Sequence, residues 1–328
     1  MRWSWLAVMV GCSGTPVEAE APGDTAAAPA EVSVALNWYP EPEFAGIYQA
    51  DIDGTYAAAG LKVDIQGGGP GSPVISQVAT GRVAFGVSTA DEVVLAKSQG
   101  ADVLAVFATY QTHPACILVW EARGLNGLQD LTGGTLAMED GIPFAQWLKK
   151  KFAFTGVTQV PYGGGIQSLL LDQNYAQQAY VTSEAVLAKK QNIATECFMV
   201  SETGYNPYAN VMITSSKFAK EHPDQVHAFV DATAKGWDAY VYGDPTAANQ
   251  KISSLNPALD VAVLGEMAAA QKPLIVQGIA ETETIGLMEE SRWVELIGQL
   301  NEIGAITGNP PVPSDVYTNE FLQYRRSK

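Results

Sequence analysis

Histidine, cysteine and basic residues are scarce in this chain of 328 residues. It has only 3 His and 3 Cys, and no CxxC, HExxH or histidine cluster. Because transition metals are held by such groups at short spacing, we expect no metal site. Lys and Arg number 19 against 35 Asp and Glu, so the net charge is -16. Since an acidic field repels phosphate groups, we expect no binding of nucleic acid.

A long apolar run is also missing, and the N-terminus has only a brief one. The stretch MRWSWLAVMVGC has one Arg and apolar residues from Trp5 to Val10, which is typical of a secretory signal and too short to span a bilayer. Its end resembles a bacterial lipobox, so residues 1–12 are predicted to be a lipoprotein-type signal peptide with Cys12 lipidated. A plain signal peptide or a misassigned start is the alternative. Residues 13–31, which contain no basic residue, are predicted to be a flexible acidic tether.

The rest of the chain has the composition of a folded protein. Hydrophobic residues make up 47% and charged residues 16%, and the length suits two domains of ordinary size. Cys116 and Cys197 each lie in an apolar run, which favours buried free thiols. A disulfide between them is the alternative that the sequence leaves open.

Short apolar runs alternate with helical patterns from Val32 onward, which favours an α/β protein with parallel strands. Predicted strands occupy 32–38, 61–66, 83–88, 103–109, 115–122, 134–140, 157–162, 177–182, 197–201 and 209–216. Predicted helices occupy 43–60, 72–81, 90–100, 142–154, 166–174 and 183–191, followed by longer ones at 216–242, 244–254, 259–270 and 291–303.

The simplest topology for this order has two α/β lobes. Lobe 1 would consist of residues 32–119 and 209–328, and lobe 2 of residues 120–208. Two crossings between the lobes would form a hinge, with the ligand in the cleft between the lobes. The carboxyl ends of the strands and the N-termini of the helices should face that cleft.

Four segments resemble the NMT1/THI5-like group of substrate-binding proteins of ABC importers. They are LNWYPEPEFAGIYQA (36–50), GRVAFGVSTADEVVLAKSQG (81–100), AYVTSEAVLAKKQ (179–191) and YANVMITSSKFAKEHPDQVHAFVDATAKGWDAY (208–240). The resemblance extends from about residue 32 to about residue 257. It implies a two-lobed periplasmic-binding-protein fold of type II that delivers a small solute to an ABC permease and its ATPase.

The resemblance also limits the function. Several members of the group bind thiamine-precursor pyrimidines, which are the ligand we favour, and relatives bind riboflavin, sulfonates, nitrate or aromatic carboxylates. Eukaryotic relatives are enzymes that make the thiamine pyrimidine from pyridoxal phosphate and one of their own histidines. Phe44 stands at the position of that histidine. We therefore expect a non-enzymatic protein without cofactor. We also expect it to be monomeric and to be lipid-anchored in the periplasm or at the cell surface.

Aromatic and acidic residues at strand ends are the main candidates for ligand contact. Trp38 and Tyr39 end the first strand, where they could stack on a flat heterocycle. Tyr180 and Glu184 end a strand and begin a helix in lobe 2, where the group has an acidic residue. A carboxylate there could accept hydrogen bonds from an aminopyrimidine; otherwise Glu184 is a favourable acid at a helix N-terminus.

Glycine-rich turns and hydroxyl groups complete the predicted site. Gly68 and Gly164 lie in turns that precede helices and could offer backbone N–H groups, or could serve tight turns alone. Ser88, Thr89 and Asp91 follow the third strand, where they could contact the ligand or cap the helix.

Three further acids follow strands. Asp140 is predicted to face the cleft after a lobe 2 strand, whereas Glu41 and Glu43 are predicted to be solvated acids of a turn. An anionic ligand should favour an Arg in the cleft, and only Arg82 and Arg123 lie near it in sequence. This favours an uncharged or cationic ring.

Overall fold

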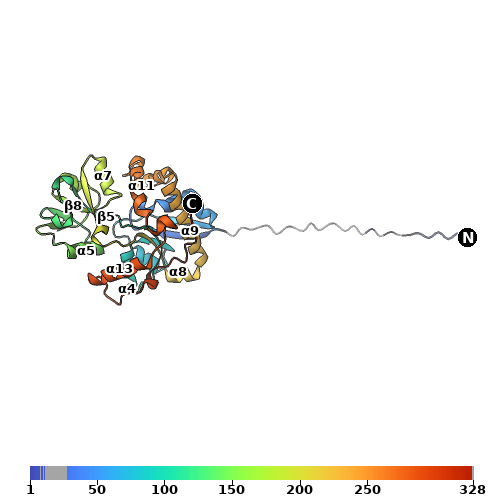
Figure 1. Ribbon diagram of the computed structural model, residues 1–328. Helices are drawn as coiled ribbons and strands as arrows, with labels where there is room; N and C mark the ends of the chain where they lie inside the picture. Colours follow the sequence, from blue (N-terminus) through green and yellow to red (C-terminus); the bar gives the residue numbers. More distant parts are fainter. Residues whose placement is uncertain (8, 10, 12–27, 327–328) are drawn as a thin grey trace.

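The computed structural model of the protein describes residues 1–7, 9, 11 and 28–326. Two α/β lobes lie side by side, each built around its own five-stranded sheet (Figure 1). Within the described residues, no helix has both the length and the apolar character needed to cross a bilayer. Cys12, and with it the predicted lipidation, lies outside the described residues.

The sheet of lobe 1 has the strand order β2-β1-β3-β10-β4. Its strands are β1 (Ala30–Ala35), β2 (Leu61–Gln66), β3 (Phe85–Ser88), β4 (Leu104–Tyr110) and β10 (Ala209–Thr214). β1 runs parallel to β2 and β3, whereas β10 runs antiparallel to β3 and β4. β10 therefore inserts between two strands that come from a distant part of the sequence.

The sheet of lobe 2 has the order β7-β6-β8-β5-β9 and repeats this plan. Its strands are β5 (Ala115–Trp120), β6 (Thr135–Ala137), β7 (Thr158–Val160), β8 (Tyr175–Tyr180) and β9 (Thr195–Met199). β6 is parallel to β7 and β8, and β5 is antiparallel to β8 and β9. In each lobe the strand that follows a crossing is thus the antiparallel one.

The chain crosses between the lobes twice, from β4 to β5 and from β9 to β10. The predicted end of the first lobe 1 segment, at residue 119, needs correction because β5 belongs to the lobe 2 sheet. An apolar run such as ACILVW can serve in either lobe, and its pairing with β8 and β9 decides which one.

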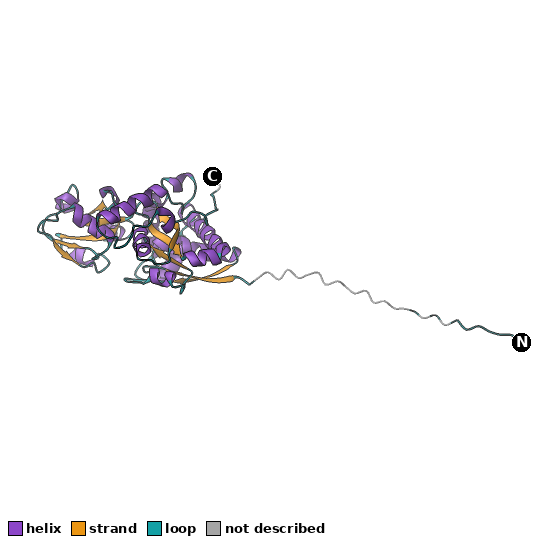
Figure 2. Ribbon diagram, turned by 90° about the horizontal axis from the view of Figure 1, so that it is seen from below, coloured by secondary structure: helices purple, strands orange, loops and turns teal. Residues whose placement is uncertain are grey.

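Helices cover both sheets (Figure 2). In the first half of the chain they are α1 (Ala45–Ile52), α2 (Thr55–Ala58), α3 (Val74–Ala79), α4 (Ala90–Ser98), α5 (Pro143–Lys151), α6 (Gln167–Leu171) and α7 (Glu184–Lys190). The C-terminal part adds α8 (Ser216–Glu221), α9 (Pro223–Tyr242), α10 (Thr246–Leu255), α11 (Val261–Ile275), α12 (Ile279–Thr282), α13 (Glu290–Glu302) and α14 (Pro313–Val316). Short 3-10 turns occupy Pro42–Phe44, Glu121–Arg123, Leu128–Asp130 and Ser201–Thr203.

The helix predicted at 216–242 is two helices, with the break at His222. Pro223 follows and begins α9, since it has no N–H to donate to the preceding turn and its fixed φ suits a first helical position. Residues of two segments described in the sequence analysis, 36–50 and 208–240, pack against each other between α1 and α9. A Cβ on Gly46 would overlap the buried ring of Trp237, and one on Gly236 would overlap the backbone of α1. These glycines therefore allow close packing of helices in the lobe 1 core.

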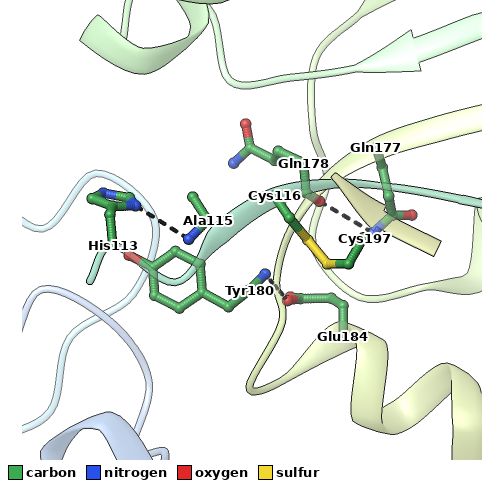
Figure 3. The surroundings of a disulfide bond; sticks show 8 residues. All are labelled: His113, Ala115, Cys116, Gln177, Gln178, Tyr180, Glu184 and Cys197. Atoms are coloured by element: carbon green, nitrogen blue, oxygen red, sulfur yellow. Dashed lines mark hydrogen bonds between the residues drawn. A yellow bond between two sulfur atoms is a disulfide. The ribbon is translucent and has the colours of Figure 1, made fainter. Parts of the chain in front are cut away.

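Cys116 and Cys197 form a disulfide, which corrects the prediction of free thiols (Figure 3). The two residues lie on the neighbouring antiparallel strands β5 and β9, with Cα atoms 5.5 Å apart, a separation within the range that a disulfide spans. The two cysteines are 81 positions apart in the chain, and nothing in the local sequence indicated that these strands would be neighbours.

Candidate functional site

A cavity of about 650 Å³ lies between the lobes. Lobe 1 contributes the segment after β1, the start of α3 and the segment from the end of β3 into α4, and lobe 2 contributes the end of β8 and the start of α7. Its polar and aromatic lining consists of Asn37, Trp38, Glu41, Glu43, Ser72, Ser76, Thr80, Ser88, Thr89, Asp91, Glu92, His113, Glu139, Phe144, Tyr162, Gln178, Tyr180, Ser183, Glu184 and Asn210. A volume of this size suits a small organic molecule.

Of the two aromatic residues after β1, only Trp38 lines the cavity. Its ring is partly buried and meets the ring of Tyr39 edge-on, with centroids 5.5 Å apart. Tyr39 is 49% exposed, and its ring lies over Gly69 outside the cavity. Gly68 does not line it either, because its N–H donates to the carbonyl of Trp38 (3.0 Å) and its Cα abuts the backbone of Leu36. The predicted roles of Tyr39 and Gly68 in ligand binding are therefore not supported by their positions.

The turn after Tyr39 is held in place by three amide side chains. Asn256 donates to the carbonyl of Pro40 (3.1 Å), Gln271 to that of Pro42 (3.2 Å), and Asn210 to that of Glu43 (3.2 Å). Gln271 is fully buried and also accepts a hydrogen bond from Tyr110 (2.7 Å). Residues 40–43 are thus fixed against α11 and β10, although they form no strand and no long helix.

This turn buries two carboxyl groups that the sequence analysis assigned to solvent. Glu43 is 8% exposed and Glu41 is partly buried, and both line the cavity. Burial, with a further contribution from the nearby Glu184, raises the pKa of Glu41 to about 7. Burial, together with the charges of Glu41 and Glu184, raises the pKa of Glu43 well above its usual value. The prediction of solvated acids was wrong because the sequence does not show that lobe 2 covers this turn.

Lobe 2 contributes a third carboxyl group, that of Glu184 at the start of α7. It accepts hydrogen bonds from the hydroxyl of Tyr162 (2.8 Å) and from the backbone N–H of Tyr180 (2.8 Å; Figure 3). Burial raises its pKa, and these two hydrogen bonds act in the opposite direction. Across the cleft, Ser183 donates to Glu41 (3.3 Å), so the acidic residues of the two lobes lie close together.

His113 is a functional candidate that sequence reasoning missed. It is buried at the first crossing and lines the cavity, with its ring 6.1 Å from that of Tyr180. Its Nδ1 accepts a hydrogen bond from the N–H of Ala115 (3.1 Å), so in the neutral ring the proton is on Nε2. Burial lowers its pKa to about 4, which makes it neutral near pH 7. As an isolated histidine in the crossing, it had no sequence signal beyond its rarity.

The hydroxyl and acidic residues from the end of β3 into α4 line the cavity but already have partners. Ser88 donates to Glu92, and Thr89, the N-cap of α4, donates to Asp91. Asp91 is 4% exposed and also accepts from the buried Tyr205 (2.9 Å). These residues therefore serve largely to cap α4 and, through the hydrogen bond from Tyr205 to Asp91, to hold the second crossing against lobe 1.

Two predicted residues of lobe 2 do not line the cavity. Gly164 has φ +84, with open space where a Cβ would be, so the backbone turn accounts for this glycine. Asp140 is largely exposed and pairs with Lys149 (3.0 Å), whereas its neighbour Glu139 lines the cavity.

Phe44, which stands where the enzymatic relatives have a histidine, is 1% exposed and belongs to the lobe 1 core.

The cavity lining is strongly acidic. Among the described residues it includes six carboxyl groups and no Lys or Arg, and its only histidine is the neutral His113. The carboxyl groups are those of Glu41, Glu43, Asp91, Glu92, Glu139 and Glu184. Such a lining favours hydrogen-bond donors and positive charge in a ligand, and opposes an anion.

A family model described as NMT1/THI5 like matches residues 41–248, which is more than half of the chain. The chain belongs to the NMT1/THI5-like family. This confirms the resemblance that the four sequence segments indicated.

Two proteins with similar sequences are named as binding proteins. The riboflavin-binding protein RibY of Chloroflexus aurantiacus is 23% identical over an alignment of 346 positions, which covers 97% of this chain and 95% of RibY. The formylaminopyrimidine-binding protein of Halalkalibacterium halodurans is 23% identical over 287 residues, which cover 82% of this chain and 84% of that protein.

A solved structure supports the fold. The periplasmic aliphatic sulphonate binding protein SsuA of Escherichia coli matches with a TM-score of 0.70 at 11% identity, covering 92% of this chain and 96% of SsuA. At this identity the match shows the fold alone. The predicted two-lobed periplasmic-binding-protein fold is confirmed.

Proposed function

We propose that this protein is the extracytoplasmic solute-binding component of an ABC importer. Its ligand is a planar, amino-substituted heterocycle of the thiamine-precursor pyrimidine type, bound in the cavity between the lobes. The observation that supports this most directly is the lining itself, which combines Trp38, Tyr162 and Tyr180 with carboxyl groups and has no Lys or Arg among the described residues. Aromatic faces bind a flat ring, and carboxylates accept hydrogen bonds from its amino groups.

The two lobes have distinct roles in this proposal. Trp38 of lobe 1 stacks on the ring, and Glu184 of lobe 2 accepts from the amino group and a ring N–H. Tyr162 and the backbone of Tyr180 hold Glu184 in place for this contact, because both of its oxygens already accept hydrogen bonds from them. A carboxylate oriented before binding loses less conformational freedom when the ligand arrives.

A ligand that touches both lobes favours their closed arrangement, and the permease recognises that arrangement. Contacts between the lobes already exist at two places. Lys190 of α7 pairs with Glu266 of α11 (3.1 Å), and Lys150 of α5 pairs with Glu302 of α13 (3.0 Å). Figure 1 shows α7 beside α11 and α5 near α13. These exposed pairs contribute little by themselves, so ligand contacts decide the equilibrium.

Riboflavin is the second candidate ligand. It is supported by the match to RibY along nearly the full length of both chains, and by a cavity whose volume also accommodates a larger ring system. Sulfonate, nitrate and aromatic carboxylate ligands are disfavoured, because six carboxyl groups and no basic residue line the cavity among the described residues. A pyridoxal-dependent enzyme is disfavoured because Phe44 is buried in the core.

We further propose that Cys12 carries a lipid that anchors the protein to a bacterial membrane, with residues 13–31 as the tether. Two or more acyl chains give stable membrane attachment. Mass spectrometry of the protein expressed in a bacterium with its native N-terminus tests this through the added mass on Cys12. Substitution of Cys12 by Ser should release the protein in soluble form.

Native mass spectrometry of the purified protein tests the ligand class, followed by calorimetry with pyrimidines, flavins and sulfonates. An aminopyrimidine should bind, and a sulfonate should not. Tight binding of a sulfonate would contradict the proposal. Incubation with pyridoxal phosphate, followed by the absorbance of a Schiff base, tests the enzymatic alternative; a stoichiometric band would favour it.

A further inference from the structure

The carboxyl group of Glu43 in the cavity has no hydrogen-bond donor from neighbouring residues that the structure describes. Glu43 is 8% exposed, yet apart from its own backbone N–H no described residue donates to its carboxyl group. Glu43 lines the cavity. Because buried acceptors are almost always satisfied, a donor from the cavity, either water or a bound ligand, belongs beside this carboxyl group.

The surroundings of Glu43 indicate what kind of donor this is. The titratable groups that act on Glu43 or are acted on by it are Glu41, Glu184, Tyr110 and Tyr180, and none of them is cationic. Glu41 and Glu43 come from lobe 1, whereas Glu184 comes from lobe 2. Three carboxyl groups brought together by two lobes repel one another once ionised, so closure requires protons or a positive charge between them.

We infer that the solute carries a protonated amine, or an equivalent cationic N–H group, that enters between Glu41 and Glu43 of lobe 1 and Glu184 of lobe 2. This inference rests on the proposed function and narrows its ligand class. The ammonium group supplies up to three donors, enough for Glu43 and the two neighbouring carboxylates. Burial raises the pKa of Glu41 to about 7, so in the empty protein this group is partly protonated at neutral pH. A bound cation displaces that proton, so binding releases protons and strengthens as pH rises through 7.

The test compares two probes that differ in one group. They are 4-amino-5-aminomethyl-2-methylpyrimidine, whose side chain is an amine, and its hydroxymethyl analogue, which is neutral there. Calorimetry at pH 7 in two buffers with different ionisation enthalpies gives both the affinity and the number of protons released. We expect the amine to bind at least about tenfold more tightly than the alcohol and to release protons on binding.

The variant Glu43→Gln should reduce the preference for the amine to less than about threefold and should lower the number of protons released. The matched control is Glu196→Gln on the exposed edge strand β9, which makes the same change in net charge and should retain the preference. Thermal unfolding of the empty Glu43→Gln protein adds an independent readout. Its midpoint should rise, because glutamine leaves no carboxyl group to bury.

The outcomes separate the inference from the proposed function. Equal binding of amine and alcohol, with both weakened by Trp38→Ala, would overturn the inference and leave the proposed function intact. An unchanged preference in Glu43→Gln would do the same. Failure of both probes to bind would overturn the proposed pyrimidine class and the inference together.

Discussion

Glu184 of lobe 2 and Glu43 of lobe 1 line the same cavity but differ in their hydrogen bonding. Glu184 accepts a hydrogen bond on each of its oxygens, from Tyr162 and from the backbone of Tyr180. Glu43 accepts none from any neighbour among the described residues, although it is more deeply buried than most acids. In the empty protein the carboxyl group of Glu184 therefore has a hydrogen-bond donor on each oxygen, whereas that of Glu43 has none from a neighbouring described residue.

The backbone of the turn that carries Glu43 is firmly held, in contrast to its carboxyl group. The turn that carries Glu43 is held by Asn210, Gln271 and Asn256 through its backbone carbonyls, so its position is fixed while its side chain stays without a partner. A group held rigidly and left unsatisfied decreases the stability of the empty protein and becomes favourable only with a ligand. On the proposed function, lobe 2 orients the ligand and lobe 1 responds to its charge.

Removal of the lobe 2 disulfide should have the largest effect. The double variant Cys116→Ser with Cys197→Ser should lose about 2–4 kcal/mol of unfolding free energy, because the bond closes a long loop of the unfolded chain. Chemical denaturation measures the loss. Hydrogen exchange should show it mainly in β5, β8 and β9; an equal loss in β1 and β3 would mean that the two lobes are not separately stabilised.

Trp38→Ala should weaken the binding of a planar ligand by about ten- to one hundredfold, since the ligand loses both a stacked ring and buried apolar surface. Calorimetry measures the loss. The adjacent Tyr39→Ala is the control, because this ring lies outside the cavity and its loss should change affinity far less. A larger effect at Tyr39 would mean that the ligand binds at the mouth of the cleft.

The contribution of Glu41 to the stability of the empty protein should fall as pH rises from about 4.5 to above 7, whereas that of His113, whose pKa is lowered to about 4, should rise between about pH 4 and 6.5. The folded pKa of Glu41 lies near 7, above its ordinary value of 4.5, so the folded state holds the proton more tightly and loses that advantage on ionisation. A tenfold difference in proton affinity between the folded and unfolded states corresponds to about 1.4 kcal/mol. Thermal unfolding from pH 5 to 8 measures the slope. Glu41→Gln should flatten it, and an unchanged slope would assign the titration to another group.

Tyr162→Phe should have a smaller effect on affinity, about three- to tenfold, because it removes one hydrogen bond from Glu184 and leaves that of the Tyr180 backbone. The loss should be largest at low pH, since the pKa of Glu184 rises further without this donor. Tyr180→Phe keeps the backbone donor and serves as the comparison. A smaller loss in Tyr162→Phe than in Tyr180→Phe would show that orientation of Glu184 is not what Tyr162 contributes.

The smallest effect is expected for Asp140→Asn, which should leave affinity within about twofold of the original value. Asp140 is exposed and pairs with Lys149 outside the cavity. Glu139→Gln, one residue earlier in the lining, should weaken the binding of a cationic ligand more. The reverse order would mean that this strand end is turned differently when ligand is bound.

Local patterns in the sequence determined much of the fold. All ten predicted strands are present, because runs such as LKVDIQ and ANVMIT combine β-branched residues with turn signals at their ends. The sequence also placed Trp38, Tyr180 and Glu184 at strand and helix ends that line the cavity. These positions follow from the rule that parallel strands and their helices direct such ends to one side of the sheet.

Contacts between distant segments decided the rest. The membership of β5 in lobe 2, the Cys116–Cys197 disulfide and the burial of Glu41 and Glu43 all depend on residues tens of positions away. From the sequence alone, a short acidic turn is expected to be solvated, because the second lobe that covers it is distant in the chain. His113 likewise has no sequence signal of function, because only the folded crossing brings it to the cavity. The chain thus specifies its strands and helices through local periodicity, whereas the charge and hydrogen bonding of the site arise only when the two lobes meet.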